Sequence, residues 1–471
     1  MTKTKIIATL GPASASGEVI LALVKAGADV FRLNMSHGDI ETHRKLIRTV
    51  RSLTKRSGVG PAAIIGDLSG PKIRVGLLEG GRAELVPGAK VTLTEREITG
   101  GPEAFHVGYK GLSKQVEKGM AVLMDDGMLE LKVVSVMRGE VVCRVVKGGV
   151  LKEHKGVNIP GMPLKLPSLT PKDLSDLEML VREGVDYVAL SFVREPGDVL
   201  ALRKRMRRMG ADIPIIAKVE RPEALRNVHD IIEVSDAVMV ARGDLGVEMP
   251  PELVPPIQKR LIRLCNQLGK PVITATQMLE SMTRNPRPTR AEASDVAGAV
   301  FDGTDAVMLS EETAAGGYPV AAVTMMNKIA REAERHQKDA HYERELITGG
   351  LEAVAVSACR AADALRARAI ISFTRTGRTA LLLSKYRPST KVIAATPDSR
   401  AGRRMRLYYG VIPVMVSLRP DTDSMLREVE RAALSMGLVK KGDTAIVTLG
   451  VPSDADTNLM KVHKIGEGFG G

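Results

Sequence analysis

Short runs of branched aliphatic residues alternate with amphipathic stretches through most of this chain, and this alternation constrains the fold most. The runs that predict buried strands are 6–10, 30–33, 62–67, 187–192, 213–219, 237–241, 272–276 and 306–309. Amphipathic patterns between most of them predict helices, for example over 171–183 and 255–268. Eight strands alternating with helices indicate a (β/α)₈ barrel, an α/β fold whose active site lies at the C-terminal ends of the strands.

The alternation breaks off between residues 71 and 164, where short strands and Gly-rich turns replace the helical pattern. Apolar segments over 133–137 and 141–146, separated by Arg-Gly-Glu, predict a β-hairpin. The segment therefore predicts a small β-barrel inserted after the third barrel strand, where it could act as a lid that excludes water.

A second α/β pattern begins after about residue 340 and predicts a C-terminal regulatory domain. Its predicted strands are 369–374, 391–395, 411–416 and 444–449. The predicted domains are the first part of the barrel (1–70), the inserted lid (71–164), the second part of the barrel (165–340) and the C-terminal α/β domain (341–471).

Composition narrows the classes of protein that this chain can represent. The 68 Lys and Arg against 55 Asp and Glu give a net charge of +13, which suits nucleic acid or anionic small molecules. Aromatic residues are only 3% and Trp is absent, so stacking platforms for nucleic acid are scarce. No apolar run is long enough to span a bilayer, and residues 6–10 fit a first strand better than a signal sequence.

We therefore expect a cytoplasmic protein with no nucleic-acid or membrane partner. Cys143, Cys265 and Cys359 are far apart and lack metal-ligand spacing, which predicts reduced structural thiols. Asn and Gln together number only 12 of 471 residues, while Arg and Glu are abundant. This balance predicts a thermophilic source, with an archaeal-type protein as one candidate.

Three charged residues stand at the ends of successive predicted strands. Lys218 and Glu220 are two apart on one strand, so their side chains point to the same face, and Asp244 follows the next strand. Two carboxylates with room for substrate oxygens suit Mg²⁺ or Mn²⁺ better than Zn²⁺. A buried salt bridge is the alternative interpretation of the same residues.

Cationic residues gather at the ends of the second and third predicted strands. Arg32 is suited to clamp a phosphate, and Asn34 and Ser36 beside it offer oxygen donors. Lys72 and Arg74 add two positive charges soon after the third strand. Each of these residues alone could be structural, but together they predict a strongly cationic pocket.

These motifs resemble, in order, the signatures of the pyruvate kinase family. They are Arg-Leu-Asn-Met-Ser-His-Gly at 32–38, Gly-Pro-Lys-Ile-Arg at 70–74, Lys-Val-Glu at 218–220, Ala-Arg-Gly-Asp-Leu-Gly at 241–246, Ala-Thr-Gln-Met-Leu-Glu-Ser-Met at 275–282 and Pro-Thr-Arg-Ala-Glu at 288–292. The resemblance covers essentially the whole chain. It implies a glycolytic enzyme that transfers the phosphoryl group of phosphoenolpyruvate to ADP, giving pyruvate and ATP, and that assembles as a homotetramer.

The resemblance also implies roles for individual residues. Glu220 and Asp244 would bind Mg²⁺ or Mn²⁺. Lys218 would neutralise charge on the transferring phosphoryl group and on the enolate oxygen, and Arg32 and Arg74 would support the same charge.

The resemblance also implies further substrate-binding residues and a set of nucleotide-binding residues. Gly243 would help to bind the substrate, and Thr276 would stand near the carbon that becomes the methyl group and help to deliver its proton. The nucleotide would meet Asn34, His37 and Lys155.

The monovalent-cation site of the family has one telling difference here. Asn34, Ser36 and Asp67 match the ligand side chains, and Leu68 needs to supply only its backbone oxygen. K⁺-dependent members carry Glu where this chain has Lys72, whose ammonium could replace the K⁺ charge. We therefore expect activity without K⁺.

A loop in the C-terminal domain resembles the effector-phosphate loop of the family. It comprises Thr374, Arg375, Thr376, Gly377, Arg378 and Thr379, which follow a predicted strand and open a helix. A plain capped helix start is the alternative interpretation. The partner loop, 450–458, lacks the Trp and Arg found where fructose 1,6-bisphosphate activates, and Asp454 and Asp456 would repel a second phosphate. A monophosphate effector is therefore favoured.

Two other functions fit part of this pattern. Another Mg²⁺-dependent barrel enzyme acting on pyruvate or phosphoenolpyruvate, such as an aldolase or lyase, would share the Glu–Asp pair but would need neither the inserted domain nor residues 70–74. A nucleic-acid-binding protein is suggested only by the charge of +13, and its binding would fall steeply with salt.

Overall fold

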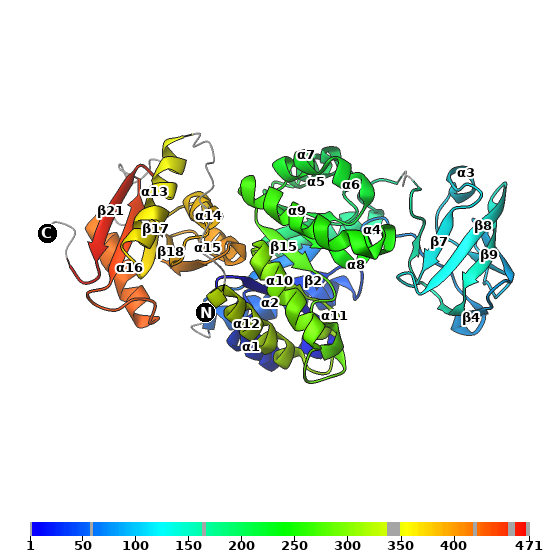
Figure 1. Cartoon of the computed structure of the whole chain (residues 1–471), viewed down its shortest axis with the longest axis horizontal. Helices are drawn as coiled ribbons and strands as arrows, with labels where there is room; N and C mark the ends of the chain where they lie inside the picture. Colours follow the sequence, from blue (N-terminus) through cyan, green and yellow to red (C-terminus); the bar gives the residue numbers. More distant parts are fainter. Residues whose placement is uncertain are drawn as a thin grey trace.

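The computed structural model describes residues 2–56, 60–162, 166–336, 349–417, 422–450 and 457–467. Three parts lie in a row, with a closed barrel in the centre and the inserted and C-terminal domains at opposite ends (Figure 1). The domain boundaries predicted at 164/165 and 340/341 fall outside the described residues, and all of the boundaries stay predictions. None of the described helices is long and apolar enough to cross a membrane.

The centre is a closed barrel of eight parallel strands, which confirms the predicted (β/α)₈ fold. In barrel order the strands are β1 (Lys5–Leu10), β2 (Val30–Asn34), β3 (Ala63–Asp67), β12 (Tyr187–Leu190), β13 (Ile215–Val219), β14 (Ala237–Ala241), β15 (Val272–Ala275) and β16 (Ala306–Leu309). Nearly every strand residue is buried, because helices cover the outside and side chains fill the inside.

Helices surround the barrel and join its strands. They are α1 (Gly17–Ala26), α2 (Ile40–Arg56), α4 (Pro171–Arg182), α5 (Pro196–Arg208), α6 (Pro222–Arg226), α7 (Val228–Val234), α8 (Arg242–Glu248), α9 (Val254–Gln267), α10 (Arg290–Asp302), α11 (Glu311–Ala314) and α12 (Pro319–His336). The helices predicted over 171–183 and 255–268 are α4 and α9, each within one residue at either end. Local sequence starts α4 sharply, since Thr170 and Asp173 form a capping box around a Pro at its first turn.

The same hydrogen-bonding arrangement recurs at every second strand on the barrel floor, the end of the barrel where the strands begin. An Asp precedes β2, β12, β14 and β16, and its carboxylate accepts a hydrogen bond from the backbone N–H of a residue that begins the neighbouring strand. The four bonds are Ile6 to Asp29 (3.2 Å), Ile64 to Asp186, Ile215 to Asp236 and Val272 to Asp305 (2.8 Å each). The N–H of each Asp donates back to the carbonyl of the same residue. These paired bonds fix the register at the barrel floor.

The inserted domain has its own apolar core and two sheets. Its elements are β4 (Arg82–Leu85), β5 (Lys90–Thr94), β6 (Ala104–His106), α3 (Leu112–Gln115), β7 (Ala121–Met124), β8 (Leu129–Met137), β9 (Glu140–Lys147), β10 (Gly149–Lys152) and β11 (Val157–Asn158). Six strands form one sheet, in the order β11-β7-β8-β9-β5-β6, and β4 pairs with β10 in a second sheet. The predicted hairpin is β8–β9. Side chains from both sheets share one apolar core. In the described residues no strand pairing joins the two sheets, so packing of side chains holds this small β domain together.

The C-terminal domain is a five-stranded sheet flanked by helices. Its strands, in sheet order, are β19 (Val411–Met415), β18 (Lys391–Thr396), β17 (Ala369–Phe373), β20 (Thr444–Leu449) and β21 (Leu459–Lys464). Its helices are α13 (Gly350–Ala364), α14 (Arg378–Lys385), α15 (Ser399–Arg404) and α16 (Thr422–Ser435). Four strands were predicted. The fifth, β21, is an antiparallel edge strand whose Lys-rich sequence hides its alternation.

Arginines of the C-terminal domain reach the Asp residues of the barrel floor. Arg403 binds Asp186 at 2.8 Å, Arg387 binds Asp305 at 3.0 Å, and Arg406 lies 3.7 Å from Asp29. The same carboxylates thus order the barrel strands and hold the domain below them. The floor carries the docking contacts, which leaves the opposite end of the barrel for the site.

Asp186 offers a direct test of this docking, because its carboxylate is 2% exposed and pairs with both Arg51 and Arg403. Asp186→Asn keeps an oxygen for the Ile64 N–H but leaves two guanidinium groups without their anion. We expect a loss of about 3 kcal/mol in unfolding free energy. Calorimetry should then show the C-terminal domain melting apart from the barrel.

The matched control is Asp212→Asn, because Asp212 is exposed and contributes its backbone oxygen, not its carboxylate, to Arg404. Its unfolding free energy should change by no more than about 0.5 kcal/mol. Equal effects of the two substitutions would show that the carboxylate of Asp186 does not hold the domains together.

Candidate active site

The C-terminal ends of five barrel strands carry the residues singled out from the sequence. Arg32 lies within β2, Asp67 ends β3, Lys218 lies near the end of β13, and Asp244 follows β14 in the first turn of α8. Thr276 comes directly after β15. Because the strands are parallel and closed into a barrel, all of these side chains reach the same mouth.

Asp67 is the carboxylate at the centre of this group. It is 1% exposed, its Oδ2 accepts from Arg32 Nε at 2.7 Å, and its Oδ1 lies 3.3 Å from Lys218 Nζ. Burial alone would raise the pKa of Asp67, but the charges of Lys218 and Arg32 outweigh that effect and lower it. Asp67 is therefore ionised, and it fixes two cations at the mouth.

Lys218 lies between two carboxylates and a hydroxyl. Its Nζ is 2.8 Å from Glu220 Oε1 and donates to Ser191 Oγ at 2.7 Å. Burial would lower the pKa of Lys218, but Asp67 and Glu220 raise it above its ordinary value. The ammonium thus stays charged although it is buried, which suits a group that neutralises charge rather than one that takes up a proton.

Glu220 combines burial with a like-charged neighbour. Its Oε2 accepts the backbone N–H of Phe192 at 2.8 Å, and its side chain is 1% exposed. Burial and the charge of Asp244 raise the pKa of Glu220, while Lys218 opposes that shift. A divalent cation would stabilise the negative charge of Glu220 that burial and Asp244 disfavour.

The donor set at the mouth fits Mg²⁺ or Mn²⁺. Glu220 and Asp244 supply hard carboxylate oxygens, and Lys218 and Lys72 each place an ammonium on one of them, at 2.8 and 3.5 Å. Each of these two carboxylates thus has an ammonium partner at the mouth.

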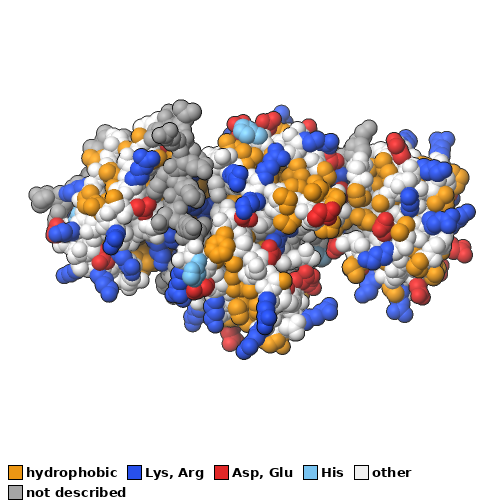
Figure 2. All heavy atoms as spheres, in the orientation of Figure 1, with side chains coloured by type: hydrophobic (Ala, Val, Ile, Leu, Met, Phe, Trp, Pro, Cys, Tyr) orange, Lys and Arg blue, Asp and Glu red, His pale blue; other side chains and the backbone are white. Residues whose placement is uncertain are grey.

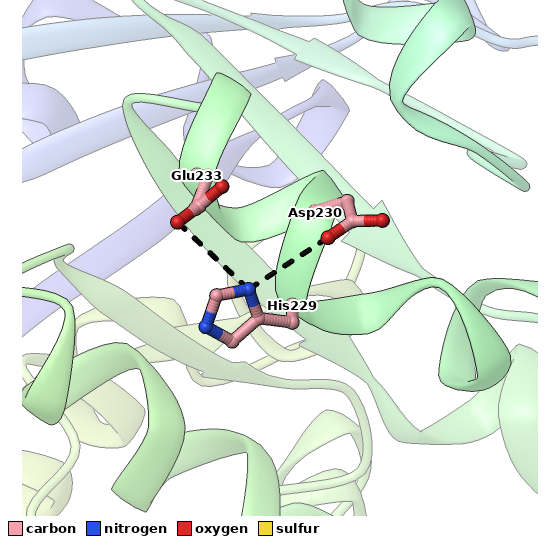
Figure 3. A group of neighbouring side chains, drawn as sticks. All are labelled: His229, Asp230 and Glu233. Atoms are coloured by element: carbon pink, nitrogen blue, oxygen red, sulfur yellow. Dashed lines mark ion pairs between the residues drawn. The ribbon is translucent and has the colours of Figure 1, made fainter.

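Elsewhere among the described residues, one group of three potential ligands lies close together on α7, namely His229, Asp230 and Glu233 (Figure 3). All three are exposed, and Nδ1 of His229 lies 3.7 and 3.9 Å from the carboxylates. This is a solvated helix face.

Thr276 adopts a strained backbone at the mouth. Its φ is +68°, and that of Gln277 is +53°, which is rare for a β-branched residue and its neighbour. The Thr276 hydroxyl accepts from the Gly243 N–H at 2.8 Å and donates to the Ala275 carbonyl at 2.6 Å. These bonds hold the hydroxyl against the first turn of α8 and stabilise the strained conformation.

Sequence reasoning missed two residues that support these groups. Ser191 links Lys218 to the Leu68 carbonyl, to which its hydroxyl donates at 2.8 Å. Arg242 donates to the Thr276 carbonyl at 2.7 Å and pairs with Asp295 at 2.7 Å. Both residues stand at the ends of predicted strands, next to other polar residues. That position was the only sequence feature that could have indicated their role.

Lys72 forms an ion pair that the sequence did not indicate. Its ammonium lies 3.5 Å from Asp244 Oδ1, at the proposed metal carboxylate. Asp67, which the resemblance assigns to the monovalent-cation set, binds Arg32 and Lys218. The charge of Lys72 is therefore at the mouth, but its ion-pair partner among the described residues is Asp244.

The remaining predicted residues lie on the barrel and on the inserted domain. Asn34 Oδ1 accepts the Ser36 N–H at 3.2 Å, and the Arg74 guanidinium donates to the His154 carbonyl at 2.9 Å. Desolvation, followed by the positive charges of Arg74 and Arg32, lowers the pKa of His37. Lys155, on the inserted domain, pairs with Asp125 at 2.7 Å.

The predicted effector loop connects β17 to α14 in the C-terminal domain. Thr374 Oγ1 accepts the Gly377 N–H at 3.0 Å, and Gly377 has a φ of +90°. Arg375, Thr376 and Arg378 are exposed, while Thr379 is buried and bonds to Thr457 at 2.8 Å. Residues 451–456, including Asp454 and Asp456, lie outside the described residues. The loop thus presents hydroxyl and guanidinium groups beside a helix start.

Comparisons with known proteins agree over almost the whole chain. Residues 1–323 match the family model "Pyruvate kinase, barrel domain", and 352–463 match "Pyruvate kinase, alpha/beta domain". Pyruvate kinases of Staphylococcus saprophyticus and Staphylococcus aureus are 48% and 46% identical, across 99% of this chain and 81% of theirs.

A solved structure supports the same assignment. A crystal structure of a pyruvate kinase from Cryptosporidium parvum aligns with a TM-score of 0.91 at 38% identity, and the match covers 98% of this chain and 96% of that one. With the family models and the bacterial relatives, this likeness extends to all three parts of the molecule. The chain belongs to the pyruvate kinase family.

Proposed function

We propose that this protein transfers the phosphoryl group of phosphoenolpyruvate to ADP, giving pyruvate and ATP, as the glycolytic pyruvate kinases do. The observation that carries the proposal is the buried Lys218, held charged between Asp67 and Glu220 at the barrel mouth. Phosphoryl transfer needs positioned positive charge more than covalent catalysis, and this mouth supplies it.

The substrate side is formed by Arg32, Lys218, Gly243, Asp244 and Thr276. Arg32 and Lys218 are fixed by Asp67, so they can neutralise the phosphoryl group without first reorganising. Arg74 adds charge from the inserted domain. Glu220 and Asp244 would hold Mg²⁺ or Mn²⁺, which would supply further positive charge to the substrate.

Protonation of enolpyruvate involves Thr276 as a positioning group. Its hydroxyl hydrogen is engaged by the Ala275 carbonyl at 2.6 Å. The proton therefore comes from a water that the hydroxyl holds near the carbon, rather than from Thr276 itself. Asn34 and His37 from the barrel, with Lys155 from the inserted domain, face the nucleotide.

The assay that tests this function couples pyruvate formation from phosphoenolpyruvate and ADP to lactate dehydrogenase. We expect ADP-dependent and metal-dependent turnover, and a fall in kcat of about 10³-fold or more in Lys218→Met and Glu220→Gln. Lys204→Met, on the exposed side of α5, should match the wild type.

Pyruvate formation without ADP would instead support a lyase or aldolase. The nucleic-acid alternative has little support, because Lys and Arg on the face shown in Figure 2 are scattered over all three parts among Asp and Glu.

Independence from K⁺ rests on Lys72. Its ammonium is at the mouth, 3.5 Å from Asp244, where it adds a permanent positive charge. We expect the wild type to turn over at full rate in Na⁺-free tetramethylammonium buffer, and Lys72→Glu to gain a K⁺ requirement. Initial rates with and without K⁺ measure both, and a strict K⁺ requirement in the wild type would contradict the proposal.

Regulation by a monophosphate rests on the loop formed by residues 374–379. AMP, a sugar monophosphate and a phosphoglycerate, each titrated into the assay beside fructose 1,6-bisphosphate, should show activation by at least one monophosphate. Thr376→Ala and Arg378→Ala should abolish that response and leave the basal rate unchanged, because both side chains are exposed and lie in the C-terminal domain. An unchanged response in these variants would remove the effector from this loop.

Three further properties are proposed. A homotetramer follows from the family resemblance, and a cytoplasmic location follows from the reduced thiols expected for the three cysteines. A thermophilic source, with an archaeal type as one candidate, rests on the scarcity of Asn and Gln and stays a prediction from composition.

A further inference from the structure

The inserted domain and the barrel have separate apolar cores. One buried cluster spans the barrel strands and their helices, and a second runs from Ile73 to Met162 within the inserted domain. No cluster of fully buried apolar residues in the described part of the chain spans both domains, although Leu166, on the returning connection, packs against the core of the inserted domain. The angle between the domains therefore depends on contacts at the two connections between them.

Three polar contacts made by side chains cross between the inserted domain and the barrel in the described residues. Lys72 Nζ lies 3.5 Å from Asp244 Oδ1, on the connection that leaves the barrel. On the returning connection, Asn158 Nδ2 donates to Glu248 Oε1 at 2.8 Å, and Arg221 Nη2 donates to the Met162 carbonyl at 3.0 Å. The outgoing connection thus contacts helix α8, and the returning connection contacts both α8 and Arg221.

The geometry of α8 explains why it meets both connections. Asp244 and Glu248 are four residues apart, so their side chains lie on the same helix face one turn from each other. One carboxylate meets the outgoing connection and the other meets the returning connection. Arg221 joins the second contact, because its Nη1 lies 3.3 Å from Glu248 Oε1.

The two contacts differ in strength. The side chains of Lys72 and Asp244 are 27% and 29% exposed, so solvent weakens their 3.5 Å ion pair. Arg221, Glu248 and Asn158 are 5%, 5% and 9% exposed, and they are joined by hydrogen bonds. A cavity of only about 10 Å³ lies between the connections, the lower limit for one water. The buried contact is therefore the rigid one.

We propose that Asn158, Glu248 and Arg221 form the pivot that sets the angle of the inserted domain over the barrel mouth, and that Lys72–Asp244 is a releasable contact beside it. The role in catalysis rests on the proposed kinase function. Asp244 is also a proposed metal ligand, so a divalent cation held there would draw on the same carboxylate as Lys72. Such a cation would weaken the Lys72–Asp244 contact but would not involve the three residues of the pivot.

These three residues are positioning residues, because none of them reaches the reacting groups. They act by placing Lys155 of the inserted domain opposite His37 of the barrel, the two sides of the proposed nucleotide site. Loosening the pivot should therefore affect ADP more than phosphoenolpyruvate, whose proposed ligands lie mostly on the barrel.

Fluorescence energy transfer can report the angle without substrates. Lys118→Cys on the inserted domain and Arg263→Cys on α9 place two exposed thiols for labelling. The natural Cys143, Cys265 and Cys359 are buried, and burial raises their pKa, to about 12 for Cys143, so they should react slowly. The labelled full-length protein is then compared among pivot variants, with and without Mg²⁺.

Glu248→Gln and Asn158→Ala should broaden the energy-transfer distribution, and should raise KM for ADP about fivefold or more with KM for phosphoenolpyruvate within about twofold. Glu223→Gln is the matched control, because Glu223 also binds Arg221, at 3.2 Å, and has no hydrogen bond to the inserted domain within the described part of the chain. It should leave both measurements unchanged.

An energy-transfer distribution that is the same in the wild type and in both pivot variants would overturn the proposal. Asn158→Ala serves if Glu248→Gln folds poorly, because it leaves the Arg221–Glu248 pair intact. The distributions are measured without turnover, so absence of kinase activity would reject the proposed function and leave the pivot open to the same test.

In the wild type, Mg²⁺ should shift the energy-transfer distribution. No shift would show that a metal does not weaken the Lys72–Asp244 contact.

Discussion

The site depends on one buried carboxylate, that of Asp67. It holds Arg32 at 2.7 Å and Lys218 at 3.3 Å, and so keeps two cations side by side at the barrel mouth. Without a shared anion, two neighbouring positive charges in a buried site would repel each other and lose hydration. Their arrangement before substrate arrives is what allows the mouth to receive a phosphoryl group with little reorganisation.

The barrel separates this chemistry from the contacts that join its domains. Its floor carries the alternating Asp residues, three of which bind arginines of the C-terminal domain. Its mouth carries the charged site and, through α8, the connections to the inserted domain.

Much of this architecture could be predicted from the sequence, because the apolar runs repeat with the period of a (β/α)₈ barrel. Lys218, Glu220 and Asp244 could be placed at one mouth, since parallel strands end together. Tertiary partners could not be predicted in the same way. Ser191 looks like any small polar residue at a strand end, and Arg221 was hidden because its partner Glu248 lies 27 residues away. The ion pair of Lys72 with Asp244 joins residues 172 positions apart, so no local pattern indicates it.

The most direct test of the central claim is the kcat of Asp67→Asn, measured with its unfolding free energy. The substitution preserves shape and removes the charge that orders Arg32 and Lys218. We expect kcat to fall about 100-fold or more in protein that remains folded, because the cations lose their fixed positions. A folded Asp67→Asn enzyme with kcat within about twofold of the wild type would contradict the account.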